Sequence, residues 1–348
     1  MSQSIRYAVG YQLPDDRDST LEMVEDYRQH IDEVYFAWLG QASGRTPVGV
    51  LEGFEPDEAR ECMTEELTRL GRLGVKLTLL CNANCYGGQA ASKTLSRKTL
   101  EHVGEMQEKF GIGAVTTASP YLAREIKRAF PELEIRASVN MRIGTVNAMQ
   151  CLEGFFDSFY MQREFNRDME TIYRLRRWCD EHGKKLNMLV NSGCLSFCPY
   201  QTFHDNLVAH ESEIDHSDFN MKNASYCRDW MKPEAHHADY LRATWIRPED
   251  MHHYAGLFDS YKLATRISYS PRKIVAAYAR GRHRGNLADL TEPGFDFGKY
   301  IIDNTLFPED WFERTSTCGR RCESCGYCQQ VYEKVRVDIN ELEKKYQQ

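Results

Sequence analysis

The stretch Asp168–Asn191, DMETIYRLRRWCDEHGKKLNMLVN, predicts a helix followed at once by a strand. Apolar residues recur with helical spacing over Asp168–His182 and form one stripe, while the arginines project elsewhere. Gly183 stands where the end of a helix commonly needs a left-handed residue, and Lys185–Asn191 is a short β-rich run. A helix leading directly into a strand is the repeating unit of an α/β protein.

The same alternation runs through most of the chain. Further strands are predicted over Ile5–Gln12, Glu33–Leu39, Val75–Cys81, Ala114–Ala118, Glu134–Val139, Ser158–Gln162 and Asp259–Thr265. Further helices are predicted over Ser19–Gln29, Asp57–Leu73, Ser96–Phe110, Tyr121–Ala129, Val146–Leu152 and Pro271–Arg280. About eight βα steps in roughly 280 residues favour a TIM-like (β/α)8 barrel over an open sheet, with Leu241–Trp245 as a candidate extra strand.

We therefore expect two parts, a TIM-like barrel domain over residues 1–310 and a cysteine-rich C-terminal extension over residues 311–348. The charged amphipathic pattern of Val331–Gln348 predicts a helix that ends the extension. Candidate functional residues are expected in the βα loops of the first part and in the cysteine run of the second.

Composition narrows the class of protein. Of the 348 residues, 42% are hydrophobic, and the formal net charge is -7. The negative net charge argues against extensive binding of phosphate groups, although a local basic groove stays open. No run approaches the roughly 18 apolar residues of a transmembrane helix, and no signal peptide is visible at the start. Twelve cysteines without an export signal predict cytoplasmic thiols, which more often hold metal or do redox chemistry than form disulfides.

Polar residues follow six of the predicted strands, at the end of a barrel where chemistry takes place. Arg163 and Glu164 follow the sixth strand and suggest a carboxylate or phosphate clamp beside a titratable group, so we predict that both are catalytic and face the cavity. Substrate-binding roles are predicted for Asn140, Asn191 and Arg45, which follow the fifth, seventh and second strands. The alternative for each single residue is ordinary turn or cap chemistry.

Three cysteines of the predicted barrel lie in loops at one end. Cys194 and Cys198 directly follow a strand, and Cys227 follows in an irregular segment, so the three thiols can hold a metal cluster. Cys85 lies in another βα loop and is the candidate for a fourth ligand. Packing roles are expected for the cysteines within predicted helices and strands, which are Cys62, Cys81, Cys151 and Cys179.

The extension contains a second, denser group of thiols, Cys318-x3-Cys322-x2-Cys325-x2-Cys328. Zinc sites usually pair two short knuckles across a long loop, whereas four thiols within eleven residues favour a ferredoxin-like 4Fe-4S cluster. Zinc and an unmetallated thiol group stay open as alternatives. The first three cysteines match the spacing of radical S-adenosylmethionine enzymes, but their place in the tail and the nearby Cys328 make that match coincidental.

At this point the chain resembles a known family. Leu189–His210, with Arg163-Glu164 one strand earlier and Cys227 beyond, is similar to peptidase family U32, the collagenase-like proteins, as are Trp245–Met251 and Tyr261–Arg266. The resemblance covers most of the barrel and implies a cysteine-held 4Fe-4S cluster. Family members are named as proteases, and several are similar to oxygen-independent hydroxylation factors for ubiquinone precursors, tRNA or rRNA.

Two departures from the family pattern bear on the cluster ligands. In some members an early cysteine after strand two joins the cluster, but Gln41–Arg45 contains no thiol, which is why Cys85 is considered instead. The tail cysteines are not general to the family and suggest a subgroup with a second cluster, used as an electron relay or for structure.

The expected function is iron–sulfur redox chemistry, such as oxygen-independent hydroxylation of a nucleic acid or small molecule. One alternative is a metal-dependent peptidase or hydrolase, although no Ser-His-Asp order and no H-E-x-x-H motif supports it. The other alternative is a non-catalytic iron–sulfur partner subunit. A protein partner or a homo-oligomer also stays open.

Overall fold

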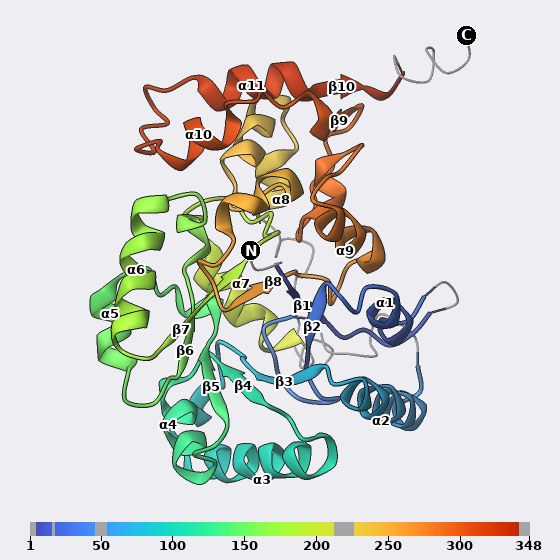
Figure 1. Ribbon diagram of the computed structural model, residues 1–348, viewed down its shortest axis with the longest axis vertical. Coiled ribbons are helices and arrows are strands. Elements are labelled where there is room, and N and C mark those ends of the chain that lie inside the picture. Colours follow the sequence, from blue (N-terminus) through green and yellow to red (C-terminus); the bar gives the residue numbers. More distant parts are fainter. Residues whose placement is uncertain (1–4, 16–17, 46–53, 212–225, 341–348) are drawn as a thin grey trace.

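Eight parallel strands form a closed barrel in the computed structural model, which describes residues 5–15, 18–45, 54–211 and 226–340 (Figure 1). Each strand pairs with the next along the chain, and β8 pairs with β1 to close the barrel. The strands are β1 (Tyr7–Gly10), β2 (Ile31–Phe36), β3 (Lys76–Cys81), β4 (Ala114–Thr117), β5 (Glu134–Ala137), β6 (Ser158–Tyr160), β7 (Lys185–Leu189) and β8 (Ser260–Lys262). The predicted TIM-like barrel is confirmed.

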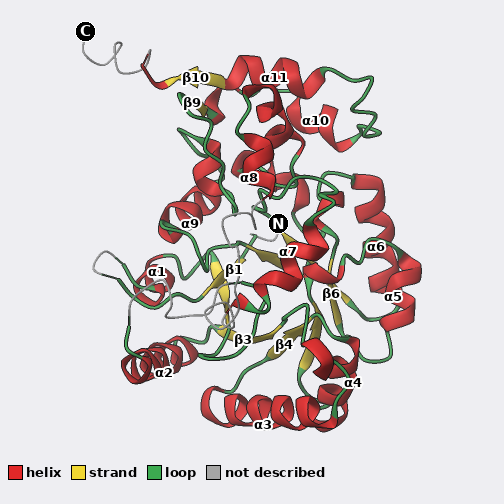
Figure 2. Cartoon of the chain, turned by 180° about the vertical axis from the view of Figure 1, so that it is seen from behind, coloured by secondary structure: helices red, strands yellow, loops and turns green. Residues whose placement is uncertain are grey.

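Helices surround these strands (Figure 2). They are α1 (Thr20–Asp26), α2 (Pro56–Arg72), α3 (Lys93–Phe110), α4 (Pro120–Ala129), α5 (Val146–Leu152), α6 (Met169–Glu181), α7 (Gln201–Val208), α8 (Tyr226–Met231) and α9 (Pro271–Arg280). The apolar stripe predicted for α6 is buried against the barrel, because Ile172, Leu175 and Trp178 are core residues. Asp168 caps this helix by accepting a hydrogen bond from the backbone N–H of Thr171, as its side chain predicts.

The barrel interior is partly polar. Arg136 of β5 forms an ion pair with Glu33 of β2, with 2.7 Å between Nη1 and Oε1, and the hydroxyl of Thr78 donates to the same carboxylate oxygen at 2.9 Å. All three side chains are buried. Because side chains alternate along a strand, residues two positions further on face the same interior, and Tyr35 follows Glu33 in this way. The polar interior therefore continues toward the carboxyl ends of the strands.

The C-terminal extension packs directly on the barrel loops and lies at the upper end of the view in Figure 1. It contains α10 (Trp311–Ser316), α11 (Tyr327–Val335) and β10 (Arg336–Asp338), and β9 (Tyr300–Ile302) precedes it in the chain. Trp311 is only 1% exposed and stacks on Trp245, with 5.9 Å between ring centroids. β9 and β10 pair in antiparallel fashion across the proposed boundary at residue 310, which stays a prediction.

Two predicted elements are wrong. The helix expected over Val331–Gln348 ends at Val335, because Arg336–Asp338 forms β10 and finds its hydrogen-bonding partner in β9. Residues 341–348 lie outside the described residues. The candidate strand Leu241–Trp245 is also wrong, since a 3-10 helix covers Glu234–Arg242 and the barrel is already closed by eight strands.

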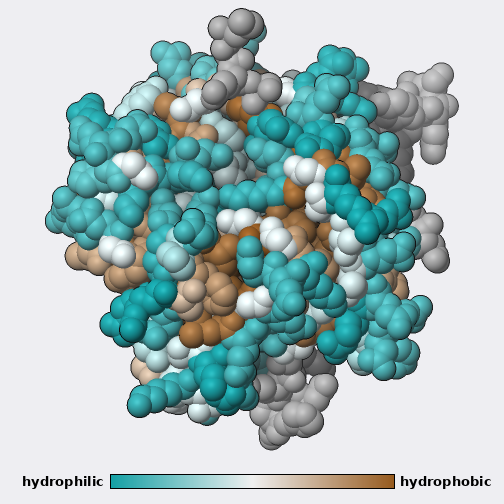
Figure 3. Space-filling view, turned by 60° about the horizontal axis from the view of Figure 1, so that its bottom comes forward, coloured by the Kyte–Doolittle hydropathy of each residue, from teal (hydrophilic) through white to brown (hydrophobic). Residues whose placement is uncertain are grey.

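The surface carries both hydrophilic and apolar side chains. On the face shown in Figure 3, hydrophilic side chains predominate and apolar ones gather near the centre. Within the ranges described, none of the helices combines the length and the apolar character needed to cross a membrane.

Candidate functional site

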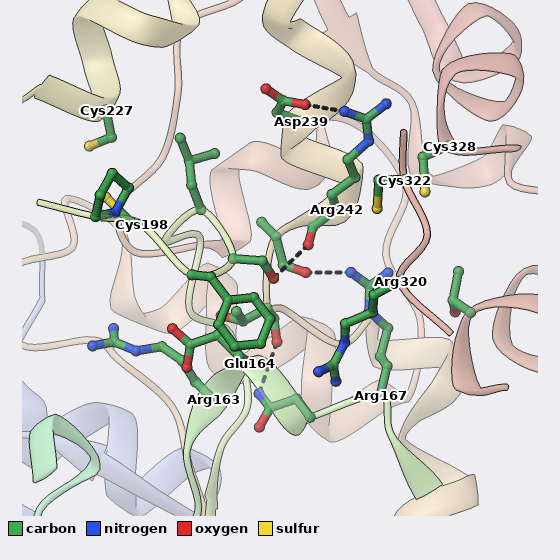
Figure 4. A pocket seen from close by; sticks show the side chains of 18 of the residues that line it. Arg163, Glu164, Arg167, Cys198, Cys227, Asp239, Arg242, Arg320, Cys322 and Cys328 are labelled. Atoms are coloured by element: carbon green, nitrogen blue, oxygen red, sulfur yellow. Dashed lines mark hydrogen bonds and ion pairs between the residues drawn. The ribbon is translucent and has the colours of Figure 1, made fainter. Parts of the chain in front are cut away.

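A pocket of about 650 Å³ lies between the barrel loops and the C-terminal extension, and we call it the interface pocket (Figure 4). Its barrel wall comes from the segment that follows β6, from Leu195–Tyr200 after β7, and from α8. Its opposite wall comes from the cysteine run of the extension, and Arg242 and Asp239 of the 3-10 helix Glu234–Arg242 complete it.

Arg163 and Glu164 form part of the wall of this pocket. They begin a short 3-10 helix directly after β6, and both are buried, at 2% and 6% exposure. The amide of Gln201, oriented by its hydrogen bonds, joins them: its nitrogen donates to Glu164 Oε1 at 3.2 Å and its oxygen accepts from Arg163 Nε at 3.0 Å. Oε2 of Glu164 has no hydrogen-bond partner among the described residues. The two residues therefore lie where the sequence predicts, while their catalytic roles stay predictions.

Gln201 is a residue that sequence reasoning missed. It begins α7, is 6% exposed and lies within the family-like stretch Leu189–His210, but no role was predicted for it. Only the fold brings it between Arg163 and Glu164. Its place three residues after Cys198 is the one signal that could have drawn attention to it.

The barrel thiols surround one side of the interface pocket. Cys198 and Cys227 line it, and Cys194 accepts a hydrogen bond from Nη1 of Arg163 at 3.2 Å. Burial, together with the neighbouring Cys194 and Cys198, raises the pKa of Cys227 to about 11. Cys85 stands apart: its sulfur accepts from the backbone N–H of Gly87 at 3.4 Å, and it is absent from the described lining of the pocket.

The loop that carries Cys194 depends on a glycine. A Cβ atom at Gly193 would collide with the carbonyl oxygen of Pro293, so only glycine lets the two segments run side by side. The backbone N–H of Gly193 donates to the carbonyl of Glu292 at 3.0 Å, which holds this close approach in place. Gly193 thus sets the path of the cysteine-containing loop after β7.

The thiols of the extension face the same pocket from the opposite side. Cys318, Cys322 and Cys328 line it, whereas Cys325 is exposed and is absent from its described lining. Arg320 anchors this loop to the barrel, because its guanidinium lies 4.8 Å from the ring centroid of Phe165 and forms an ion pair with Asp168 at 3.7 Å. The two cysteine groups are therefore opposite walls of one pocket (Figure 4).

The donor set of each wall has the right chemistry for a thiolate-held cluster. Soft thiolate ligands select iron–sulfur clusters and zinc, and compact cysteine runs bind cubanes. As positioned, no group of three or more His, Cys, Asp and Glu side chains in the described ranges is gathered closely enough to hold a metal ion. The cysteines of each wall therefore fit such a cluster in two respects: they are thiol ligands, and they lie on the same side of the pocket.

Aromatic side chains stand exposed at the rim of the interface pocket. Phe197, Tyr200 and Trp230 are 54%, 48% and 50% exposed, although each lines the pocket. Tyr200 stacks on Tyr226, with 4.4 Å between ring centroids. Large apolar groups are exposed together where a protein contacts a ligand or a partner, so this rim marks a binding surface.

Of the three predicted substrate-binding residues, Asn191 is hydrogen-bonded inside the fold, whereas Asn140 and Arg45 line a cavity. The amide of Asn191 is fully used inside the fold: it donates to the carbonyls of Ala264 and Leu290 at 3.0 and 2.9 Å and accepts from the N–H of Ala264 at 2.6 Å. Asn140 and Arg45 line a second, smaller cavity at the carboxyl end of the barrel. We call it the barrel-mouth pocket.

No family model matches the chain, but it is similar to a curated protein and to a solved structure. An uncharacterized protease of Methanocaldococcus jannaschii, MJ1657, is 25% identical over 285 residues, which is 79% of this chain and 81% of that protein. The solved structure of the U32 peptidase Mk0906 superimposes with a TM-score of 0.54 at 16% identity, over 75% of this chain and 92% of that one.

Proposed function

The chain is similar to the U32 peptidases, and we propose that it is an iron–sulfur redox enzyme whose substrate binds in the interface pocket. One observation carries the proposal: thiols of the barrel and thiols of the extension form opposite walls of the same pocket. Cys194, Cys198 and Cys227 would hold one 4Fe-4S cluster, with the fourth ligand unassigned between Cys85 and the substrate. The four tail cysteines would hold a second cluster. When bound, such clusters accept and donate single electrons.

The roles of the pocket's own residues follow from their contacts. Glu164 keeps one carboxylate oxygen without a partner, so this atom can take a proton from a substrate or return it. Gln201 holds Arg163 beside it, and Arg163 in turn donates to Cys194. A proton-transferring group and an electron-transferring thiol cluster would thus be linked through one arginine. That arrangement supports redox chemistry coupled to proton movement, such as oxygen-independent hydroxylation.

The walls of the pocket favour a planar substrate. Exposed aromatic rings at the rim can stack on a ring of the substrate. Arg163, Arg167, Arg242 and Arg320 line the same cavity. The guanidinium of Arg167 is pinned by donation to the carbonyls of Leu241 and Ala243 and lies over the rings of Trp245 and Trp311, so its position is set by the fold.

A metal-dependent peptidase or hydrolase is the second candidate, because the relatives carry the names protease and peptidase. A hydrolytic metal site needs one metal ion with an open position, and it holds no sulfide. Acid-labile sulfide in the purified protein would therefore exclude this candidate as the main function. We place the protein in the cytoplasm, since reducing conditions keep its many thiols available for clusters.

The test is electron paramagnetic resonance and metal analysis on protein purified without oxygen, wild type against Cys325→Ser. This variant removes one tail ligand that lies outside the described pocket lining, so the barrel cluster's signal should persist while the iron content falls by about half. Stoichiometric zinc in the tail would contradict the relay and leave that site a structural role. Absence of iron and sulfide from wild type would contradict the whole proposal.

A second variant separates an enzyme from a non-catalytic partner subunit. Glu164→Gln keeps the size and hydrogen bonding of the side chain but removes its acid–base function. We expect unchanged iron content and a loss of turnover of about 10²- to 10⁴-fold, the usual contribution of a positioned general acid or base. Full activity in this variant would contradict the role assigned to Glu164.

A further inference from the structure

The barrel-mouth pocket is a second site with chemistry of its own. Its volume is about 40 Å³, and it lies where β2, β3, β7 and β8 end, contacted by Tyr35, Leu80, Leu189 and Lys262. Arg45 and Glu292 reach it from loops, and Arg266 from the segment after β8. It shares no lining residue with the interface pocket.

Positive charge exceeds negative charge in this pocket. Arg45, Lys262 and Arg266 line it, and Glu292 is the one carboxylate in its described lining. That carboxylate is engaged by Arg45, with 3.0 Å between Nε and Oε1. Within the described residues, Lys262 and Arg266 are therefore left without a carboxylate partner in contact.

Both remaining cations keep hydrogen-bond donors that have no partner in the described structure. Arg266 is 6% exposed and donates through Nη2 to the hydroxyl of Ser43 at 3.0 Å, but its Nε and Nη1 have no partner in the described structure. Nζ of Lys262 lies 3.7 Å from the ring centroid of Tyr35 and 5.6 Å from that of Tyr160. No hydrogen bond or ion pair joins this ammonium group to another described residue. Buried donors and charges without partners are costly, so such a site favours an anion that supplies them.

The pKa values of Lys262 and Arg266 are both lowered, which agrees with a site in which positive charge exceeds negative charge. Burial, with Arg266 and Arg45 nearby, lowers the pKa of Lys262 to about 7. Burial is also the main reason why the pKa of Arg266 falls to about 10. The charged and titratable groups around Lys262 are Arg45, Arg266, Glu292, Glu33, Tyr35 and Tyr160.

We propose that the barrel-mouth pocket binds the oxyanion group of a small molecule, a carboxylate or a phosphate, between Arg266 and Lys262. A guanidinium offers paired N–H donors that match either group. A single water needs about 10–15 Å³ by this measure, so 40 Å³ admits one such group rather than a whole large substrate. Oε2 of Glu292 has no partner in the described structure and can accept a hydrogen bond from a hydroxyl next to the anion. The inference does not depend on any metal cluster.

The experiment is isothermal titration calorimetry of the full chain at pH 8 and low ionic strength with inorganic phosphate, acetate and glycolate. Each titration is done in two buffers that differ in ionisation enthalpy. We expect saturable 1:1 binding with uptake of a fraction of a proton, because an anion beside Lys262 favours its charged form. Glycolate should bind more tightly than acetate, because its hydroxyl can reach Glu292. Binding of phosphate alone would identify a phosphate site, and binding of the two carboxylates alone would identify a small-acid site.

Two variants and a control locate the binding. Arg266→Gln and Lys262→Met should each weaken it about ten- to a hundredfold, the effect of losing a charge-assisted hydrogen bond, and Lys262→Met should also abolish proton uptake. Arg97→Gln, an exposed arginine on α3, should bind as wild type does. If neither pocket variant folds, the wild-type protein is the test: saturable binding with proton uptake supports the site, and binding without proton uptake contradicts it. Absence of saturable binding for all three anions, or equal binding by wild type and the folded pocket variants, would overturn the proposal.

Discussion

The interface pocket and the barrel-mouth pocket differ in size, in wall chemistry and in how their residues are distributed along the chain. The first has about 650 Å³ and is walled by thiols, arginines and exposed aromatic rings. The second has about 40 Å³ and is walled by cations, of which Arg266 is buried and Arg45 and Lys262 are partly exposed. Most residues of the first come from short stretches such as Leu195–Tyr200 and Cys318–Cys328, whereas those of the second come singly from separate strands and loops. The comparison suggests a division of labour, in which a large substrate reacts at one pocket and a small anionic group is held at the other.

The largest expected effect is the loss of one whole cluster from the interface pocket. Cys198→Ser removes a thiol from the wall of this pocket, so we expect the iron content to fall by about half and turnover to disappear. The control is Cys151→Ser, which changes an exposed thiol on α5 outside both pockets. Iron content equal to wild type in Cys198→Ser would show that the barrel thiols hold no cluster.

The next effect concerns the packing that holds the second wall of the interface pocket. Trp311 is buried between Trp245 and Phe307, and Arg167 lies 5.3 Å from the centroid of its ring. Trp311→Ala should lower the free energy of unfolding by about 3–5 kcal/mol, as for other large-to-small core substitutions, measured by urea denaturation. Trp230→Ala, half exposed at the pocket rim, should change it by less than about 1 kcal/mol. Equal effects would contradict a docked extension.

A smaller effect separates a structural asparagine from one that lines a pocket. Asn191→Ala breaks three buried hydrogen bonds, so we expect a loss of about 2–4 kcal/mol in the free energy of unfolding. Asn140 makes one side-chain hydrogen bond, to Asn84 at 3.2 Å, and lines the barrel-mouth pocket. Asn140→Ala should therefore cost less than about 1 kcal/mol. A larger loss for Asn140→Ala than for Asn191→Ala would contradict the structural role inferred for Asn191.

The smallest effect is a pH-dependent change at the barrel-mouth pocket. The pKa of Lys262 is lowered from 10.5 to about 7, so the unfolded chain binds more protons than the folded one between these values and stability rises with pH across that window. At pH 6 the folded protein carries the burial penalty, and Lys262→Met should stabilise it by about 1–3 kcal/mol after allowance for partial exposure. The gain should vanish near pH 10.5 in thermal unfolding measured across this range. A gain independent of pH would indicate better packing rather than relief of a buried charge.

The sequence predicted the barrel for physical reasons, whereas the roles of the predicted site residues stay predictions. Period-3.6 and period-2 patterns such as those in Asp168–Asn191 report which face of an element is buried, and the closed barrel follows from their alternation. Arg163 and Glu164 could be found because they directly follow a strand. No role could be predicted for Gln201, Lys262 and Arg266, although they lie in stretches that resemble the family, since their neighbours are distant along the chain and only closure of the barrel brings them together. Asn191 looked like a binding residue because an amide that supports the fold has the same side chain as one that holds a ligand.

The most direct test of the central claim is the iron, sulfide and zinc content of the wild-type chain purified without oxygen. Two 4Fe-4S clusters, one for each wall of the interface pocket, predict about eight iron atoms and about eight sulfides per chain with negligible zinc. About four of each would leave one wall without its cluster. One zinc ion per chain, or neither iron nor sulfide, would contradict the account.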